Sequence, residues 1–172
     1  SFYNMFYEFR SFNQPIMIPN GVTNTANMFV ACFSFNQPVT IPNGVTNMYY
    51  MFFRCYNFNQ PVTIPNSVTN MAIAFQYCNH FNQPITISSS VTNMYGIFQY
   101  CNNFNQSVTI PSSVTNLRNA FVYCLPLMNS TSTIPVHISS SIAIGNTSNY
   151  IYNALANGYT GINWTGRILN DA

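Results

Sequence analysis

Apolar and polar positions recur along most of this chain with a fixed period. The tripeptide Phe-Asn-Gln occurs five times, and each copy begins 23 residues after the previous one. The copies begin at Phe12, Phe35, Phe58, Phe81 and Phe104. Five cysteines and five Val-Thr-Asn tripeptides keep the same spacing without any insertion. A strict period of this length indicates a repeat protein, in which each unit stacks on the next.

Each unit is predicted to contain a short strand, a turn and a short helix. Residues 35–41 end in alternating apolar and polar side chains with β-branched residues, which favours a strand. Residues 42–44 (Pro-Asn-Gly) have the residue types of a tight turn. Apolar residues then follow at offsets of three and four over residues 48–55, which suits a short helix with Thr46 or Asn47 as its N-cap. One unit cannot bury its apolar face alone, so a solenoid is predicted.

Two segments, VTIPNGVTNMYYMFFRC and VTIPNSVTNMAIAFQYC, carry a resemblance to a known family. They resemble the BspA-like surface branch of the leucine-rich repeats, whose units follow VTIPxSVTxIxxxAFxxCxxL, with phenylalanine in place of the leading leucine. The resemblance covers about residues 1–126. It implies a leucine-rich-repeat-like stack of short parallel strands with short helices on the opposite side. Such a fold is a scaffold whose ligands vary, so the resemblance specifies the fold more than the function.

The period divides the chain into three parts. Residues 1–11 correspond to the second half of a unit and are predicted to form a partial N-terminal repeat or cap. Residues 12–126 hold the five complete repeats. Beyond them the register breaks, and residues 127–172 are predicted to form a degenerate sixth repeat with an insertion and a C-terminal cap or tail.

Charged residues are scarce: the chain has four arginines, Glu8, Asp171 and no lysine. A net charge of +2 without a basic cluster argues against a nucleic-acid partner. The two carboxylates lie near opposite ends of the chain, so they cannot form a paired-carboxylate active site or a carboxylate-rich metal site. We therefore expect no enzymatic activity, no cofactor and no metal. The chain also has no apolar run long enough for a transmembrane helix.

The cysteines are predicted to form one inward-facing column with one thiol in each coil. They are Cys32, Cys55, Cys78, Cys101 and Cys124. Buried free thiols are the favoured interpretation, because a free cysteine packs as a small apolar side chain. Disulfides between adjacent coils are the alternative, and at least one of five cysteines would then stay unpaired. A zinc site is less favoured still, because no Cys-x-x-Cys motif is present.

A second column consists of the asparagines of the Phe-Asn-Gln motifs. They are Asn13, Asn36, Asn59, Asn82 and Asn105, and each is followed by a glutamine. We expect a structural ladder in which these amides bond to each other and to the backbone of the neighbouring coil. The alternative is a polar strip that recognises glycans or protein loops.

Two groups of residues are candidates for a contact surface. The outward column of the predicted strands contains Thr40, Thr63, Thr86 and Thr109, with Met17 in the first copy. Solenoids use such faces for binding, but threonine hardly varies here between copies. The predicted helical side varies more and contains Tyr49, Tyr50 and Tyr95. These tyrosines are either an aromatic contact surface or packing between neighbouring coils.

These observations favour a non-enzymatic extracellular recognition or adhesion module of leucine-rich-repeat type. The expected partner is a protein or glycan ligand. The alternative is a structural subunit of an extracellular filament, virion tail or fibre, in which the partners are copies of the chain, because an almost uncharged surface opposes self-association only weakly. Either function places the chain outside the cell, at the cell surface or on a virion.

Overall fold

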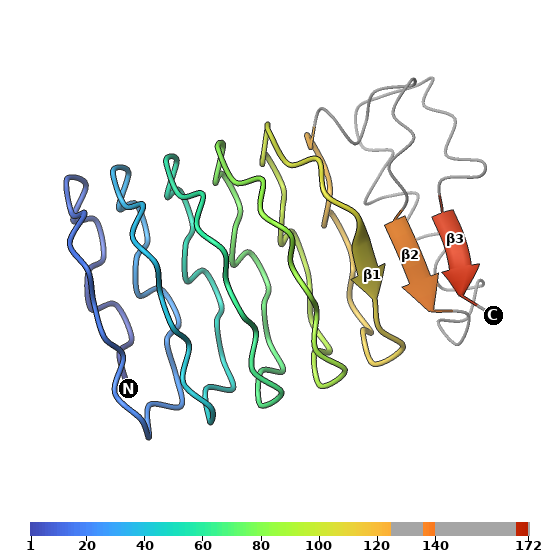
Figure 1. Ribbon diagram of the computed structural model, residues 1–172, viewed down its shortest axis with the longest axis horizontal. Coiled ribbons are helices and arrows are strands. Elements are labelled where there is room, and N and C mark those ends of the chain that lie inside the picture. The colour runs from blue at the N-terminus through green and yellow to red at the C-terminus, as the bar shows by residue number, and fades with distance from the viewer. Residues whose placement is uncertain (125–135, 140–167, 172) are drawn as a thin grey trace.

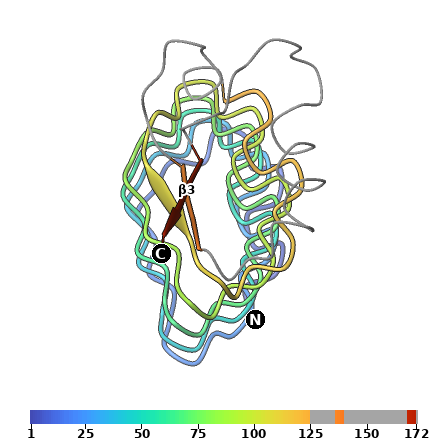
Figure 2. The same cartoon turned by 90° about the vertical axis from the view of Figure 1, so that its right-hand side faces the viewer.

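The structure is a computed structural model that describes residues 1–124, 136–139 and 168–171. The chain winds into successive coils that stack side by side along one axis (Figure 1). Viewed along that axis, the coils superpose and enclose a flattened interior (Figure 2). A repeat solenoid, as predicted from the 23-residue period, is therefore the observed architecture.

One long side of each coil carries the residues predicted as strands, and we call it the extended face. It consists of residues 15–18, 38–41, 61–64, 84–87 and 107–110. Buried Val39 and Ile41 flank exposed Thr40, which is the alternation of a half-buried strand. Only the last copy is assigned as a strand, because no backbone hydrogen bond joins the first four copies to one another within residues 1–107. The strand prediction thus holds for side-chain orientation but not for hydrogen bonding in those four coils.

The strands that do form lie at the C-terminal side of the stack. Strands β1 (Val108–Ile110), β2 (Val136–Ser139) and β3 (Ile168–Asp171) make a parallel sheet in the order β1-β2-β3 (Figure 1). Val108 pairs with Val136, which is 28 residues later instead of 23. The strict period therefore ends after the fifth repeat. The rest of the predicted sixth repeat and C-terminal cap, over residues 127–172, lies outside the described residues.

The opposite long side, which we call the turn face, consists of residues 1–9, 24–32, 47–55, 70–78, 93–101 and 116–124. A short helix was predicted here, and this prediction is wrong: the described segments are runs of turns. Their amides alternate between two kinds of acceptor. Tyr50 N donates to Ala72 O of the next coil at 3.1 Å, whereas Met51 N donates to Met48 O of its own coil at 3.1 Å. A helix would direct every amide to its own segment.

Left-handed backbone at two positions in each turn segment explains why no helix forms. The first position holds Asn4, Asn27, Tyr50, Ile73, Gly96 and Asn119, and the second holds Glu8, Ala31, Arg54, Tyr77, Tyr100 and Tyr123. At all twelve positions the φ angle lies between +56° and +63°. A left-handed residue breaks a right-handed helix, and each break turns the next amide toward the neighbouring coil.

The core between the two faces contains two parallel columns of phenylalanine. One column runs through Phe6, Phe29, Phe52, Phe75, Phe98 and Phe121, and the other through Phe12, Phe35, Phe58, Phe81 and Phe104. Rings stack along each column, as in the Phe52–Phe75 pair with centroids 5.4 Å apart. Rings also stack between columns, as in the Phe52–Phe58 pair at 4.3 Å. Each such pair contributes about 0.5–1.5 kcal/mol beyond the burial of its area.

Residues 1–11 precede the first complete repeat, and their backbone is hydrogen-bonded to the second coil. Phe2, Asn4, Phe6 and Glu8 donate their amides to carbonyls of the second coil. The turn face thus has the same hydrogen-bonding pattern here as in the complete repeats.

No helix among the described residues is long and apolar enough to cross a membrane.

Candidate functional site

The extended face presents its threonines to solvent. Thr40, Thr63, Thr86 and Thr109 are all exposed, and Met17 at the head of the column is 84% exposed. Buried aliphatic side chains flank each of the four threonines, so these residues expose small hydroxyl and methyl groups. A face that repeats the same residue from coil to coil has little to distinguish one ligand from another.

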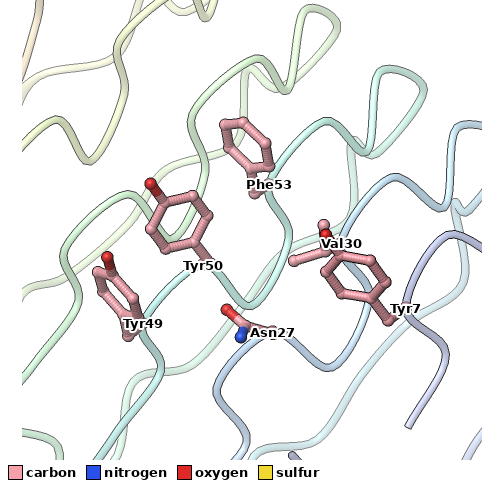
Figure 3. Close-up of a pocket in the computed structure, with 6 residues that line it drawn as sticks. All are labelled: Tyr7, Asn27, Val30, Tyr49, Tyr50 and Phe53. Carbon is pink, nitrogen blue, oxygen red and sulfur yellow. The ribbon is translucent and has the colours of Figure 1, made fainter. Parts of the chain in front are cut away.

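The turn face instead carries an aromatic depression, which is shown in Figure 3. It has a volume of about 280 Å³ and is lined by Tyr7, Asn27, Val30, Tyr49, Tyr50 and Phe53. Three consecutive coils contribute to it: the first provides Tyr7, the second Asn27 and Val30, and the third the other three residues. The positions that these residues occupy vary from coil to coil, so the same combination of side chains does not recur in the other described coils.

Three rings of the depression pack edge to face against one another. Tyr49 and Tyr50 meet edge to face with centroids 4.4 Å apart and planes at 75°. Tyr50 meets Phe53 in the same way at 4.8 Å and 65°. Figure 3 shows Tyr50 between Tyr49 and Phe53, with the Asn27 amide below them on the side toward Tyr7. Edge-to-face packing is a favourable geometry for aromatic pairs, so it fixes the orientation of these three rings relative to one another.

The local backbone explains how these side chains reach the surface. Tyr49 donates its amide to the Asn47 side-chain oxygen at 3.0 Å, which fixes the start of the turn segment. Tyr50 and Asn27 occupy equivalent left-handed positions with φ of 57° and 56°. Tyr50 and Asn27 are partly exposed, and the neighbouring Tyr7 and Tyr49 are 50% and 38% exposed.

The depression is uncharged at neutral pH. Burial, together with the hydrogen bond to Tyr49, raises the pKa of the Tyr50 phenol above its ordinary value. The Arg54 guanidinium lies over the Phe53 ring, 5.1 Å from its centroid, but Arg54 is not among the residues that line the depression. The groups that a ligand meets are therefore ring surfaces, phenol hydroxyls and one amide.

The third tyrosine of the predicted contact surface lies elsewhere. Tyr95 belongs to the same column as Tyr49 but lies two coils further along, with Ala72 between them. Its hydroxyl accepts a hydrogen bond from Asn119 Nδ2 at 3.5 Å. Tyr95 is not among the residues that line the depression, so the candidate surface contains Tyr49 and Tyr50 without it.

The asparagine column forms hydrogen bonds between coils. Asn36 Oδ1 accepts from the Asn59 amide at 2.9 Å and from Gln60 Nε2 at 3.1 Å, and the same pair of bonds recurs in each coil. The accepting residues are Asn13, Asn36, Asn59 and Asn82, and Asn105 donates its amide to Asn82. Because the side-chain oxygens are occupied in this way, the column serves as a structural ladder and leaves few groups for a ligand.

The cysteine column is also occupied by structural contacts. All five thiols are free and buried, and each donates to the carbonyl of a phenylalanine in the preceding coil, as Cys78 does to Phe52 O at 3.1 Å. Burial raises the pKa of the Cys32 thiol to about 12, and it raises the pKa of Cys55, Cys78, Cys101 and Cys124 as well. These thiols stay protonated at neutral pH, so they are poor nucleophiles and poor metal ligands.

The structure also contains an aromatic row that the sequence analysis missed. Tyr77 and Tyr100 stack with centroids 4.4 Å apart, and Tyr100 and Tyr123 stack at the same distance. Arg54 extends the row, with its guanidinium 5.7 Å from the Tyr77 ring centroid. The signal was available, because these tyrosines are 23 residues apart. The predicted helix, however, did not indicate that their rings would face one another.

Among the described residues, no group of three or more histidine, cysteine, aspartate or glutamate side chains is placed to hold a metal ion. The aromatic depression is therefore the candidate site with the most distinctive arrangement of side chains on the turn face.

Comparisons with known proteins agree on a repeat fold. A family profile described as "Mycoplasma protein of unknown function, DUF285" matches residues 1–64 and 41–133. The crystal structure of a leucine-rich repeat protein from Bacteroides ovatus ATCC 8483 is similar, with a TM-score of 0.52 and 17% identity, over 79% of this chain. This chain spans 42% of the length of that protein. No curated protein matches the chain. The likeness to a leucine-rich repeat protein concerns the fold alone at this level of identity.

Proposed function

This chain belongs to the DUF285 family, and we propose that it is a non-enzymatic recognition module that binds a protein partner through the aromatic depression. The observation that carries the proposal is the convergence of Tyr7 from the first coil with Tyr49, Tyr50 and Phe53 from the third coil on one surface without charged lining residues. Tyrosine is enriched at the energetic centres of protein interfaces, because it offers a large apolar ring and a hydroxyl group at a low entropic cost.

We further propose that the module acts outside the cell as an adhesin of the BspA-like type. The repeated VTIP segments support this placement, because they resemble the units of BspA-like surface proteins. The leucine-rich-repeat fold of the Bacteroides ovatus protein supports a scaffold of the same general kind. Six charged residues in the whole chain leave apolar and hydrogen-bonding contacts as the basis of recognition.

The test is binding of the fluorescently labelled chain to epithelial cells, measured by flow cytometry before and after protease treatment of the cells. We expect saturable binding that protease abolishes and glycosidase does not. Tyr49→Ala and Tyr7→Ala should each weaken binding by about tenfold or more, which is the effect of losing one aromatic anchor. Both residues are well exposed, so neither substitution should unfold the solenoid.

Thr40→Ala is the matched control, because Thr40 is exposed on the extended face, away from the depression. It should bind as the parent chain does. Absence of saturable binding would refute the recognition function, and full binding by Tyr49→Ala would refute the site. Sedimentation of the chain at micromolar concentration separates the rival function: a monomer fits a recognition module, whereas defined oligomers or filaments would favour a structural subunit.

A further inference from the structure

The residue that follows the extended face is proline in every complete repeat except one. Proline follows the last isoleucine of the face at Pro19, Pro42, Pro65 and Pro111, but the fourth repeat has Ser88 at this position. The tight turn there consists of three serines, residues 88–90, in place of the Pro-Asn-Gly of the second repeat. Ser88 is buried, with 7% of its surface exposed, so the side chain points into the structure.

A hollow of about 310 Å³ opens beside Ser88, between the third and fourth repeats. Its polar wall is formed by Thr63, Asn66, Thr86 and Ser88, and two exposed prolines, Pro61 and Pro84, flank it. Thr63 and Thr86 belong to the exposed threonine column, whereas Thr40 and Thr109 of the same column do not line the hollow. We call it the serine pocket.

Ser88, Ser90 and Asn66 bring their polar side-chain atoms together in the serine pocket. Ser90 Oγ donates its proton to Val68 O at 2.7 Å. Ser88 Oγ lies 3.0 Å from Asn66 Oδ1 and 2.8 Å from Ser90 Oγ, and its single proton can be donated to only one of them. Because Asn66 is exposed, its amide group is accessible to a ligand beside these hydroxyl groups.

We propose that the serine pocket binds one ring of a neutral saccharide, with a hydroxyl group of the sugar completing the Ser88–Asn66 network. A hydroxyl group can donate to one atom and accept from another at once, which suits this group of side chains. The proline rings provide apolar surface for the C–H groups of the sugar.

The composition of the pocket favours a neutral sugar over other ligands. None of its lining residues is titratable, so an ionic ligand would lose its hydration without gaining a partner charge. It contains no aromatic ring to anchor an apolar side chain of a peptide. Its volume is at the lower end of the range for small-molecule sites, roughly 300–1,000 Å³, which suits a single ring.

Ser88→Pro is the most informative substitution. It introduces the residue that four other repeats carry at the same position, and Ile87, like Ile18, Ile41, Ile64 and Ile110 before those prolines, ends a segment of the extended face. The variant should fold, while it removes the hydroxyl group that organises the pocket. Thr86→Ala and Thr40→Ala form a matched pair from one exposed column, of which only Thr86 lines the pocket.

The measurement is an amide NMR titration with three neutral oligosaccharides: maltotriose, cellobiose and N,N′-diacetylchitobiose. We expect at least one to shift the Asn66 side-chain amide and the Ser88 amide saturably, with a dissociation constant on the order of 1 mM. Ser88→Pro and Thr86→Ala should weaken this binding by about tenfold or more, and Thr40→Ala should not change it.

Three results would overturn the proposal: no saturable shift with any of the three sugars, full binding by Ser88→Pro, or the same shifts caused by a neutral tetrapeptide and not by the sugars. Tyr49→Ala should leave sugar binding unchanged, since Tyr49 lies on the turn face. Failure of the saccharide site is thus distinguishable from failure of the aromatic depression.

Discussion

The two long faces of the solenoid are held together differently. On the turn face, every second amide donates to the neighbouring coil, as Phe52 N does to Ala74 O at 2.9 Å and Phe75 N to Ile97 O at 3.0 Å. On the extended face, no backbone hydrogen bond joins the copies within residues 1–107, and the side chains alone keep the coils in register. The face with regular strand-like alternation is thus the less hydrogen-bonded one.

This difference separates two tasks. The turn face supplies inter-coil hydrogen bonds in a parallel arrangement, although its residues have no strand conformation. The extended face contributes buried aliphatic side chains to the core, and the serine pocket lies between its third and fourth repeats. The solenoid is therefore joined by backbone hydrogen bonds along one side and offers space for a ligand along the other.

Hydrogen exchange should reveal the largest difference between the faces. Amides of Phe52, Ile73 and Phe75 on the turn face are expected to exchange only when the coils open globally, whereas those of Thr63 and Ile64 exchange by local fluctuation. The expected ratio is on the order of a thousandfold, which corresponds to about 4 kcal/mol. Residue-resolved exchange by NMR measures it. Equal protection on both faces would show that the extended face is paired in solution.

Truncating the core should cost most on the side of the turn face. Phe52→Ala removes a fully buried ring that stacks on Phe29, Phe58 and Phe75, and we expect a loss of about 3–5 kcal/mol in the free energy of unfolding. Thr40→Ala on the extended face should change it by less than about 0.5 kcal/mol. Urea unfolding monitored by circular dichroism gives both values. A loss below 1 kcal/mol for Phe52→Ala, on the order of a surface change, would mean that the columns are not continuous.

The asparagine ladder joins the two faces at one corner, and its effect should be smaller. Asn59→Ala removes the acceptor for the Asn82 amide at 2.9 Å and for Gln83 Nε2 at 3.2 Å, so a loss of about 1–2 kcal/mol is expected. Asn59→Asp keeps a side-chain oxygen in place and should retain most of the stability. Comparable losses in both variants, measured by urea unfolding, would contradict the role assigned to this oxygen.

Periodicity predicted the parts of the fold that depend on spacing alone. The 23-residue register was enough to predict the stacking of coils, the inward cysteines and the amide column, because equivalent residues in a solenoid must lie in one line. Burial alternates around Thr40 because successive side chains of an extended segment point to opposite faces. The inferences from spacing need only the knowledge that one coil resembles the next.

Conformation within a coil was harder to predict. Apolar residues at offsets of three and four suit a helix, but they also suit a run of turns that buries Met48, Met51 and Phe52. The left-handed positions that decide between them hold Tyr50, Arg54 and other residues that do not usually mark such a backbone. Gly96 and the asparagines at positions 4, 27 and 119 give the customary signal, but the other left-handed positions do not.

The candidate site was predicted in part. Tyr49 and Tyr50 could be selected because they vary between repeats, but a helix would have placed Tyr95 with them. The contribution of Tyr7 and Asn27 could not be foreseen, because it depends on how turns of adjacent coils stack. Ser88 was visible in the sequence as a missing proline, although its meaning required the hollow beside it.

The cross-coil hydrogen bonds have a fixed sequence separation, and this has an evolutionary consequence. Asn59 bonds 23 residues back to Asn36, and Cys78 reaches 26 residues back to Phe52. Deleting one whole repeat brings the next set of identical partners into the same places. Duplicating one repeat adds a further set of the same partners at the same spacing. Unequal recombination between repeats would therefore yield folded chains of different lengths. Only the features that break the repeat, the aromatic depression and Ser88, would be lost, doubled or moved apart by such events.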